Sequence, residues 1–496
     1  MKRFASLFVV FLSLSLWAYK PQPSYDLCEA NSDGVMLYYN YIYVDDDVYC
    51  ELTYGNEPYA GQINVPDNVT DQYIPVVGIG VYAFSDCQEL TSVYLPYSVL
   101  YIDAVAFWRC NNLEKVHLGS HLMAIGELAF ESCNNLAEIN IPQSLEFVGY
   151  LAFNFCSRLG PLYNDKYFFY YQYPQQNGET TYSIPEGIEI INTSAFSFSS
   201  FSEIIIPNTV KVIKDNAFDG SMISRVTIPP SVVTLEHKAF GQTHLMEVTV
   251  PATVKNFGDY MFDSSLFLQK AVLENPLDSI PIGTFHCCTS LESVTFPETV
   301  HKIGSSAFSN NMKLLQFDFS NIDTIYDYSF YRCESFKSIT IPPAITYIPE
   351  MAFCMCSGLT EINLPETLKG IGLYAFWQNR SLESIDIPAS VTEIGMSAFG
   401  NNTSMKDATV HWDTPIPLEY GIFDSNITLH VPAGTKQLYA EADVWKEYMN
   451  IVDDATPVIP LFHPTVNPVN SVKRLIDGKI LIERNKHLFN LNGVEE

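Results

Sequence analysis

The chain has few basic residues for its size. Its 496 residues include 27 lysines and arginines against 56 aspartates and glutamates, which gives a formal net charge of −29. A protein that binds nucleic acid presents a basic surface to the phosphates, and this sequence has no basic stripe, so we predict no nucleic-acid partner. The acidic residues are spread along the chain, as is typical of a solvated surface.

Long apolar runs are absent after the N-terminus. The one run near that end, residues 4–17, follows two basic residues and precedes Ala18. A basic start, a short apolar stretch and a small final residue are typical of a secretory signal peptide, and the run is shorter than the roughly 20 residues that span a bilayer. We predict a signal peptide at residues 1–18, export, and no membrane insertion after its cleavage.

The motifs of common enzymes and metal sites are also missing. The sequence contains no phosphate-binding loop, dinucleotide fingerprint, nucleophile elbow or paired Cys-x-x-Cys motif. His117 and His121 fall on a strand and the turn after it, not on one helical face. The acidic triplet at residues 45–47 lacks the spacing of an EF-hand loop. We predict no cofactor, no metal and no catalytic residue, with a hydrolase as a remote alternative.

The sequence contains one motif that is repeated along most of its length. The unit reads L-x-x-I-x-I-P-x-s-V-x-x-I-G-x-x-A-F-x-x-C/N-x-x, and its phenylalanine recurs every 22 to 24 residues, with one longer gap of 43. Recurrence at a fixed period is the signature of stacked repeats. These marker phenylalanines are Phe84, Phe107, Phe130, Phe153, Phe196, Phe218, Phe240, Phe262, Phe285, Phe308, Phe330, Phe353, Phe376, Phe399 and Phe423.

Each unit predicts one coil of a solenoid. The alternation of Ile139, Asn140 and Ile141 indicates a short strand, and Pro142 ends it because proline cannot donate to a ladder. We expect Ile-Gly to turn the chain and Ala-Phe to enter a short helix or tight turn, where the phenylalanine stacks on that of the next coil. A single coil cannot cover its apolar face, so the repetition is itself the fold.

This unit resembles the BspA-type leucine-rich repeat of bacterial surface proteins. It departs from the common leucine-rich form because proline, not an asparagine ladder, follows the strand. The resemblance implies a β-rich leucine-rich-repeat solenoid at residues 79–428, with one short strand and a turn or short helix in each coil. It also implies a β-rich N-terminal cap at residues 19–78 and a capping helix within residues 429–452.

The two caps carry signals of their own. In the N-terminal cap, residues 38–51 predict a hairpin that turns at the acidic triplet. In the C-terminal cap, Gly434 and Thr435 open a segment with apolar residues at helical spacing. These apolar residues are Leu438, Tyr439, Ala442 and Trp445.

Two further segments lie within or beyond the repeats. The long gap contains an aromatic stretch at residues 161–185, which we interpret as a degenerate repeat with a hairpin about Gln175–Gly178. Four prolines make residues 453–470 a stiff linker. Residues 471–496 predict a small meander and resemble the C-terminal tail of secreted Bacteroidetes proteins, which implies export with retention at the cell surface. A small stabilising appendage is the alternative.

The cysteines follow the repeat. Seven of the 11 lie three residues after a marker, where other coils have Asn or Ser, and we interpret this as a small, buried, structural position. Cys28 and Cys50 lie off this row, and a disulfide between them is an open alternative in an exported protein. The seven are Cys87, Cys110, Cys133, Cys156, Cys288, Cys333 and Cys356.

The outward residues of the strands form an extended ladder suited to a large ligand. The family resemblance implies an adhesin for host matrix proteins, plasma proteins or other cells, an inference by analogy of fold. A glycan-binding component of nutrient capture is the alternative, with the aromatic residues between Tyr163 and Tyr173 as its site. As candidate ligand contacts we select Tyr94, His117, Asn140, Asp318, Asn363 and Asp386.

Overall fold

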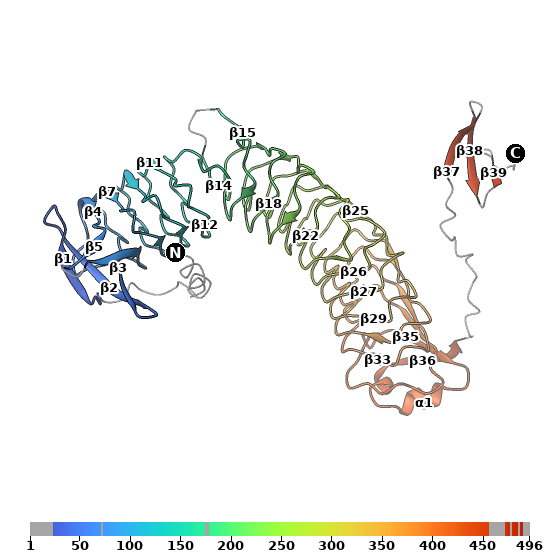
Figure 1. Ribbon diagram of the computed structural model, residues 1–496. Coiled ribbons are helices and arrows are strands. Elements are labelled where there is room, and N and C mark those ends of the chain that lie inside the picture. The colour runs from blue at the N-terminus through green and yellow to red at the C-terminus, as the bar shows by residue number, and fades with distance from the viewer. Residues whose placement is uncertain are drawn as a thin grey trace.

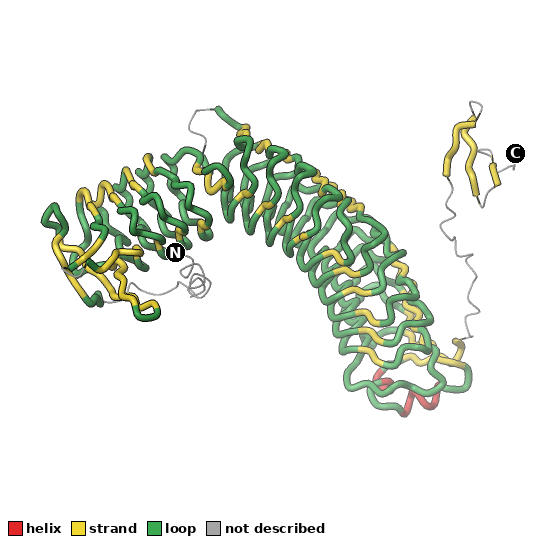
Figure 2. The backbone as a smooth tube through the Cα atoms, in the orientation of Figure 1, coloured by secondary structure: helices red, strands yellow, loops and turns green. Residues whose placement is uncertain are grey.

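The computed structural model describes residues 23–70, 73–173, 178–455, 472–476, 479–484 and 487–489. From residue 23 to 455 the chain winds into a curved β-solenoid whose coils stack along a single arc (Figure 1). Among the described residues, strands are short and helix is nearly absent (Figure 2). The fold class predicted from the repeat is confirmed. The predicted signal peptide, residues 174–177 of the insert and most of the predicted linker lie outside the described residues.

An antiparallel hairpin closes the N-terminal end. Its strands β2 (Met36–Val44) and β3 (Asp47–Thr53) meet at a two-residue turn, Asp45–Asp46, with Asp45 in the left-handed conformation at a φ of 55°. β3 then pairs in parallel with β6 (Ile74–Ile79), so the hairpin covers the first coil. The remaining cap strands are β1 (Leu27–Ala30), β4 (Gly61–Asn64) and β5 (Asn68–Val69).

Most coils carry two strands where the sequence analysis expected one. The first strand precedes the proline of the repeat, and the second strand ends at the isoleucine of Ile-Gly. For example, β10 (Ala124–Ile125) pairs in parallel with β8 (Tyr101–Ile102) and β12 (Phe147–Val148). The sequence predicts a turn at this step, because a strand of two residues shows no periodicity of its own. Parallel ladders therefore run along two sides of the solenoid.

The first strands of successive coils form one row along the solenoid, and the second strands form another. The first strands are β7 (Leu90–Tyr94), β9 (Lys115–His117), β11 (Glu138–Ile139), β15 (Thr181–Ser183), β17 (Glu203–Ile205), β19 (Arg225–Val226), β21 (Glu247–Val250), β23 (Lys270–Leu273), β25 (Ser293–Thr295), β28 (Ser338–Thr340), β30 (Glu361–Asn363), β32 (Ser384–Ile387), β34 (Asp407–Val410) and β35 (Thr428–Pro432). The second strands continue with β14 (Tyr167–Tyr170), β16 (Ile190–Ile191), β18 (Val212–Ile213), β20 (Thr234–Leu235), β22 (Asn256–Phe257), β24 (Ser279–Ile280), β26 (Lys302–Ile303), β27 (Thr324–Ile325), β29 (Tyr347–Ile348), β31 (Gly370–Ile371) and β33 (Glu393–Ile394).

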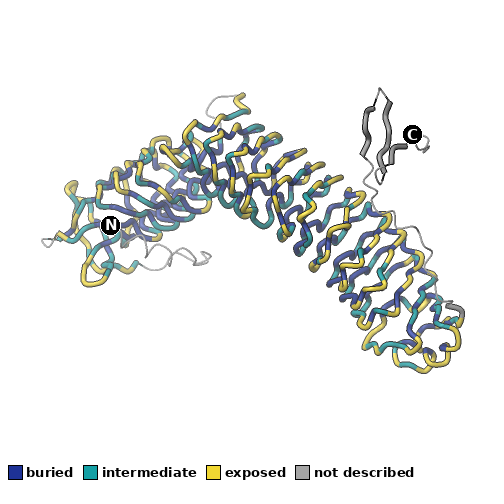
Figure 3. Tube along the Cα trace, turned by 45° about the vertical axis from the view of Figure 1, so that its right-hand side comes forward, coloured by how far each residue is buried: buried dark blue, intermediate teal, exposed yellow. Residues whose placement is uncertain are grey.

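The marker phenylalanines form the centre of the core. Buried residues run along the interior of the arc (Figure 3), and nearly every marker ring is fully buried. Successive rings stack: the centroids of Phe107 and Phe130 lie 4.6 Å apart at an interplanar angle of 10°. Such pairs add about 0.5–1.5 kcal/mol beyond their burial. Each ring is covered only when the next coil is present.

The Ala-Phe segment is a run of tight turns, not a helix. Its backbone bonds to the next coil: Phe107 N donates to Ala129 O at 2.7 Å, and Arg109 N donates to Glu131 O at 2.9 Å. The residues two before and two after the marker have positive φ, as in Val105 (51°) and Arg109 (61°). This conformation costs non-glycine residues about 1–2 kcal/mol, and the hydrogen bonds to the neighbouring coil hold it in place.

The position three residues after the marker holds a buried hydrogen-bond donor. The thiol of Cys110 donates to Phe84 O in the preceding coil at 2.9 Å. Ser265 and Asn379 likewise donate to the carbonyl of the marker phenylalanine in the coil before their own. Cys, Ser and Asn interchange here because each is small and carries a donor. Cys28 and Cys50 are free thiols, so no disulfide joins them. The contact recurs at Cys133, Cys156, Cys288, Cys333 and Cys356.

The insert divides the core in two. The ring of Tyr170 packs at a tilt on Phe153 and ends the first stack, whereas Phe168 stacks on Phe196 and begins the second. Accordingly, Tyr170 belongs to the N-terminal apolar cluster and Phe168 to the C-terminal one. Alternate residues of one strand thus serve two separate stacks.

The hairpin of the insert lies earlier than the sequence analysis placed it. β13 (Leu162–Tyr163) pairs antiparallel with β14, and the turn between them begins at Asn164, whose Oδ1 accepts from the backbone N–H groups of Lys166 and Tyr167. β14 and β15, which flank the expected turn at Gln175–Gly178, lie in different sheets. The aromatic run therefore extends the two rows of strands.

A short capping segment closes the C-terminal end. The helix α1 (Lys436–Glu441) has six residues and is followed by a 3-10 turn at Trp445–Glu447 and by β36 (Asn450–Ala455). Tyr439 and Trp445 are fully buried, and their side chains donate to backbone carbonyls of the last coil, whereas Leu438 is exposed. The expected capping helix is present but ends early, because two large aromatic anchors already cover the core.

Three strands lie beyond the predicted linker. β37 (Val472–Ile476), β38 (Lys479–Arg484) and β39 (His487–Phe489) pair antiparallel in that order, as in the predicted meander. The expected turn residues Asp477 and Gly478 lie outside the described residues.

We expect Phe308→Ala to destabilise the solenoid by about 3–5 kcal/mol, since it leaves a cavity in the middle of the stack. Urea unfolding followed by circular dichroism measures this cost. The matched control is Phe155→Ala, at a ring that is 49% exposed, with an expected change within about 0.5 kcal/mol. Equal costs at the two sites would contradict the central role of the stack.

At the thiol position we expect Cys110→Ser to be tolerated better than Cys110→Val. Serine keeps a donor for Phe84 O, while valine fills the space without one. The difference in unfolding free energy should be about 0.5–1.5 kcal/mol, the net value of one buried hydrogen bond. A valine variant as stable as the serine variant would show that only volume matters at this position.

Candidate ligand-binding surface

The first strands present the predicted ladder on the outside of the solenoid. β11, β15 and β25 lie along the outer edge of the arc (Figure 1). The six candidate residues do not gather at one place on this ladder. Tyr94, His117 and Asn140 follow one another on adjacent coils near the N-terminal cap, whereas Asp318, Asn363 and Asp386 lie in the C-terminal half.

Tyr94 and His117 form a pair across two coils. They are in register in the parallel pairing of β7 with β9, and their ring centroids lie 6.1 Å apart. His117 is exposed and Tyr94 is half-buried. Beside them, Lys115 Nζ lies 2.7 Å from Glu138 Oε2, so this basic group is already paired. The pair therefore leaves the imidazole of His117 and part of the Tyr94 ring accessible to a ligand.

A second tyrosine–histidine pair lies just beyond the first. Tyr97 is 60% exposed, its ring meets that of His121 edge to face at 6.0 Å, and His121 Nδ1 lies 3.0 Å from Tyr97 O. Neither residue is among the six candidates from the sequence. The available signal was an aromatic residue directly after the proline, where other coils have Gln143 or Glu366.

Asn140 has a structural role. Its Oδ1 accepts from Leu118 N at 2.7 Å and its Nδ2 donates to Leu118 O at 2.9 Å. The side chain thus replaces a strand partner for the backbone of the preceding coil. Each polar group of the amide makes one contact within the solenoid, so Asn140 supports the fold, and its contact with a ligand stays a prediction.

The three C-terminal candidates also have partners within the solenoid. Asp318 accepts from Ser320 N at 2.9 Å, in a coil whose first strand is not formed. Asn363 Nδ2 lies 3.1 Å from Glu361 Oε1. Asp386 Oδ1 lies 2.6 Å from His411 Nε2, a partner that sequence reasoning missed because the two residues are 25 positions apart.

The aromatic insert offers little exposed aromatic surface. Phe168, Phe169, Tyr170 and Tyr171 are at most 3% exposed and belong to the two cores, while Tyr163 remains outside. The glycan-binding alternative relied on this run as an exposed cluster. The structure removes most of that cluster from contact with solvent.

The hydrolase alternative gains no support from the described residues. A small hollow beside the insert, lined in part by Phe153, Tyr170 and Gln172, contains no carboxylate. Within the same residues, no cluster of three or more His, Cys, Asp and Glu side chains is arranged to hold a metal ion. No helix in this part of the chain is both long enough and apolar enough to cross a membrane.

Three solved structures illustrate what this chain is similar to. A leucine-rich repeat protein from Bacteroides ovatus is 20% identical, with 80% of this chain and 98% of that chain covered and a TM-score of 0.39. A leucine-rich cell surface protein from Faecalibacterium prausnitzii is 19% identical, with 88% and 96% covered and a TM-score of 0.38. The pneumococcal vaccine antigen PcpA is 15% identical, with 88% and 100% covered and a TM-score of 0.37. No curated protein matches the chain.

The repeats also match a family model along most of their length. The model describes a BspA type leucine-rich repeat region of six copies, and it matches residues 61–165, 163–285, 212–335 and 323–420. These ranges include almost all of the marker phenylalanines and both rows of strands. The chain therefore belongs to the family of BspA-type leucine-rich-repeat proteins.

Proposed function

We propose that this protein is an exported, non-catalytic adhesin that binds an extracellular protein through the outer strand ladder near its N-terminal cap. The observation that carries the proposal is the pair of tyrosine–histidine contacts on two adjacent coils, Tyr94 with His117 and Tyr97 with His121. Aromatic side chains anchor protein interfaces because they bury a large area at a low cost in conformational entropy.

The solenoid holds these side chains on a preformed surface. Tyr94 and His117 lie on strands that pair in register, and the coils beneath them are joined by stacked rings and by ladders of backbone hydrogen bonds. These side chains therefore lose little conformational entropy on binding, so less of the contact energy is offset by ordering. A neighbouring coil adds further contact without a further change in shape.

The charge of the chain favours a ligand with a basic surface. The net charge is −29, and near the tyrosine–histidine pairs Lys115 is already paired with Glu138. Complementary charge speeds encounter and is screened by salt. Binding should therefore weaken as the ionic strength rises, while the apolar contact of the tyrosine rings persists.

Export to the cell surface belongs to the same proposal. Its support is the signal-like N-terminus, and one similar protein, that of Faecalibacterium prausnitzii, is described as a cell surface protein. The glycan-binding alternative is the weaker one, because the aromatic run on which it relied is largely buried.

Stability measurements should separate the contact residues from the structural ones. We expect Asn140→Ala to cost about 1–3 kcal/mol of unfolding free energy, because it leaves the Leu118 N–H and carbonyl without their partner. We expect His117→Ala to change it by no more than about 0.5 kcal/mol, since that side chain is exposed. Equal losses in a denaturant titration would mean that His117 also supports the fold.

The binding test is a capture experiment with the chain from residue 19 onward. The array holds matrix proteins, plasma proteins and glycans, each tested at two salt concentrations. We expect saturable binding to a protein, and a loss of about tenfold or more in affinity in the Tyr97→Ala, His117→Ala double variant, as for anchor residues of an interface.

The matched control for this test is the Tyr347→Ala, His301→Ala double variant, which removes the same residue types from coils far along the solenoid. It should bind like the unchanged chain. Equal losses in both double variants would place the contact elsewhere on the solenoid. Retention of glycans alone would overturn the proposal in favour of nutrient capture.

A further inference from the structure

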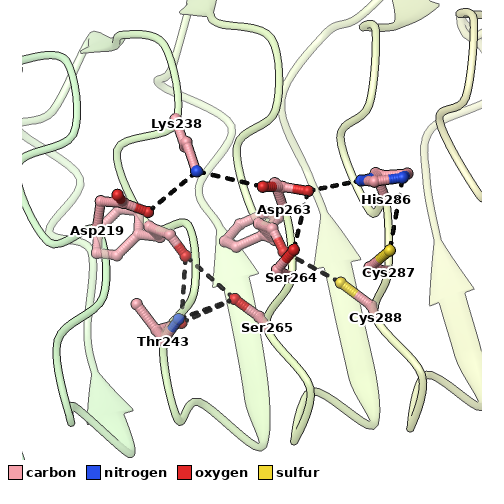
Figure 4. A network of polar contacts seen from close by, with 11 residues as sticks. Asp219, Lys238, Thr243, Asp263, Ser264, Ser265, His286, Cys287 and Cys288 are labelled. Atoms are coloured by element: carbon pink, nitrogen blue, oxygen red, sulfur yellow. Dashed lines mark hydrogen bonds and ion pairs between the residues drawn. The ribbon is translucent and has the colours of Figure 1, made fainter.

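A row of charged and nucleophilic side chains crosses four coils beside the marker phenylalanines (Figure 4). The residue directly after the marker is Asp219, Gly241, Asp263 and His286 in successive coils. The first, third and fourth of these carry an acid, an acid and an imidazole. The second, Gly241, has no side chain, and the row requires the space that this leaves.

Gly241 leaves room for a lysine from its own coil. A Cβ built at this glycine would lie 2.6 Å from Asp219 Oδ1 and 2.6 Å from Lys238 Cγ. Lys238 occupies the space: its Nζ lies 3.5 Å from Asp219 Oδ1 and 3.3 Å from Asp263 Oδ2. The lysine thus holds two carboxylates of neighbouring coils in position.

Asp263 in turn orients His286. Asp263 Oδ1 lies 2.7 Å from His286 Nδ1, and the carboxyl side chain is only 13% exposed. Burial alone would raise the pKa of Asp263, but the hydrogen bond to His286 and the charge of Lys238 outweigh it and hold that pKa below its usual range. An ionised carboxylate favours the tautomer with the proton on Nδ1, which leaves Nε2 as an acceptor.

The acceptor faces a thiol. Cys287 Sγ lies 3.5 Å from His286 Nε2. Cys287 stands in the left-handed conformation at a φ of 58° and is partly exposed, whereas the adjacent Cys288 is buried and donates to Phe262 O. Burial is the main reason that the pKa of Cys287 is raised, with the charge of Asp263 next, so the thiol keeps its proton at neutral pH. Reaction then requires a base within reach.

We propose that Cys287 is a covalent modification site for small disulfides, with His286 as its general base and Asp263 as the residue that positions the base. A nucleophile, a base and a group that orients the base are the parts that such activation requires. Of the other ten cysteines, nine are buried, and the exposed Cys28 lies in the cap, far along the chain from this row.

The step balances as a thiol–disulfide exchange. Cys287 Sγ attacks one sulfur of the small disulfide while its proton passes to His286 Nε2. The Sγ–S bond forms, the S–S bond of the reagent breaks, and the leaving thiolate takes the proton and departs as a thiol. Cys287 is oxidised to a mixed disulfide, and the reagent is reduced to one thiol.

The test uses the chain from residue 19 onward with Cys28→Ser, so that Cys287 is the one cysteine that is not buried. The probe is dithiodipyridine, an uncharged disulfide that the acidic chain does not repel and whose leaving group absorbs light. We expect one thiol to react, peptide mass mapping to place it at Cys287, and His286→Gln to slow it about tenfold or more, the low end of general-base effects.

The control is His244→Gln, which removes an imidazole that packs against Phe267 and not against a thiol. It should leave the rate unchanged. Asp263→Asn should slow the reaction less than His286→Gln does, because it acts through the base. An unchanged rate in His286→Gln, or labelling at another cysteine, would overturn the proposal.

A pH series compares the chain with Cys28→Ser and the same chain with His286→Gln added. If His286 acts as the base, the ratio of the two rates should fall as the pH rises toward the raised pKa of the Cys287 thiol, because a free thiolate needs no base. A ratio that stays the same across the series would overturn the role of His286 as a base.

Discussion

The stacking of one phenylalanine on the next is the interaction on which the rest of this structure depends. A coil of about 23 residues is too small to bury a ring by itself, and each marker is covered by the coils on both sides. The turns around the marker are strained, with positive φ at non-glycine residues, and they persist because their N–H groups donate to the next coil. Packing and hydrogen bonding thus act along the same axis and support one another.

That dependence explains the ends and the middle of the molecule. At the N-terminal end a hairpin covers the first coil, and Tyr59 packs against Phe84; at the C-terminal end Tyr448 packs on Phe423. At the insert, Tyr170 ends one stack and Phe168 begins another. Wherever the periodic ring is missing, another aromatic residue takes its place, since an uncovered ring would expose apolar area to water.

Because the stacked core holds the coils together, the surface residues of each coil can differ without changing the fold. On the side of the first strands, tyrosine–histidine pairs lie near one end and histidine–aspartate pairs lie near the other. The tight turns beside the marker phenylalanines carry the row from Asp219 to Cys287. Apart from the neighbours His286 and Cys287, these contacts join residues 19 to 25 positions apart, which stacking places side by side. Chemistry on this fold therefore arises between coils, and a single repeat read by itself does not show it.

The sequence by itself determined the solenoid, the marker stack and the buried row of small donors, because a fixed period carries both register and burial. It did not reveal the second strands, which are too short to show a pattern, nor the split of the aromatic run, where Phe168 and Tyr170 differ only in which core they enter. The task of Asn140, the exposure of Tyr97 and the approach of His286 to Asp263 and Cys287 were decided only by the tertiary structure. The physical reason is that the role of a side chain here depends on its neighbour one coil away, and on whether that neighbour leaves space, as Gly241 does for Lys238.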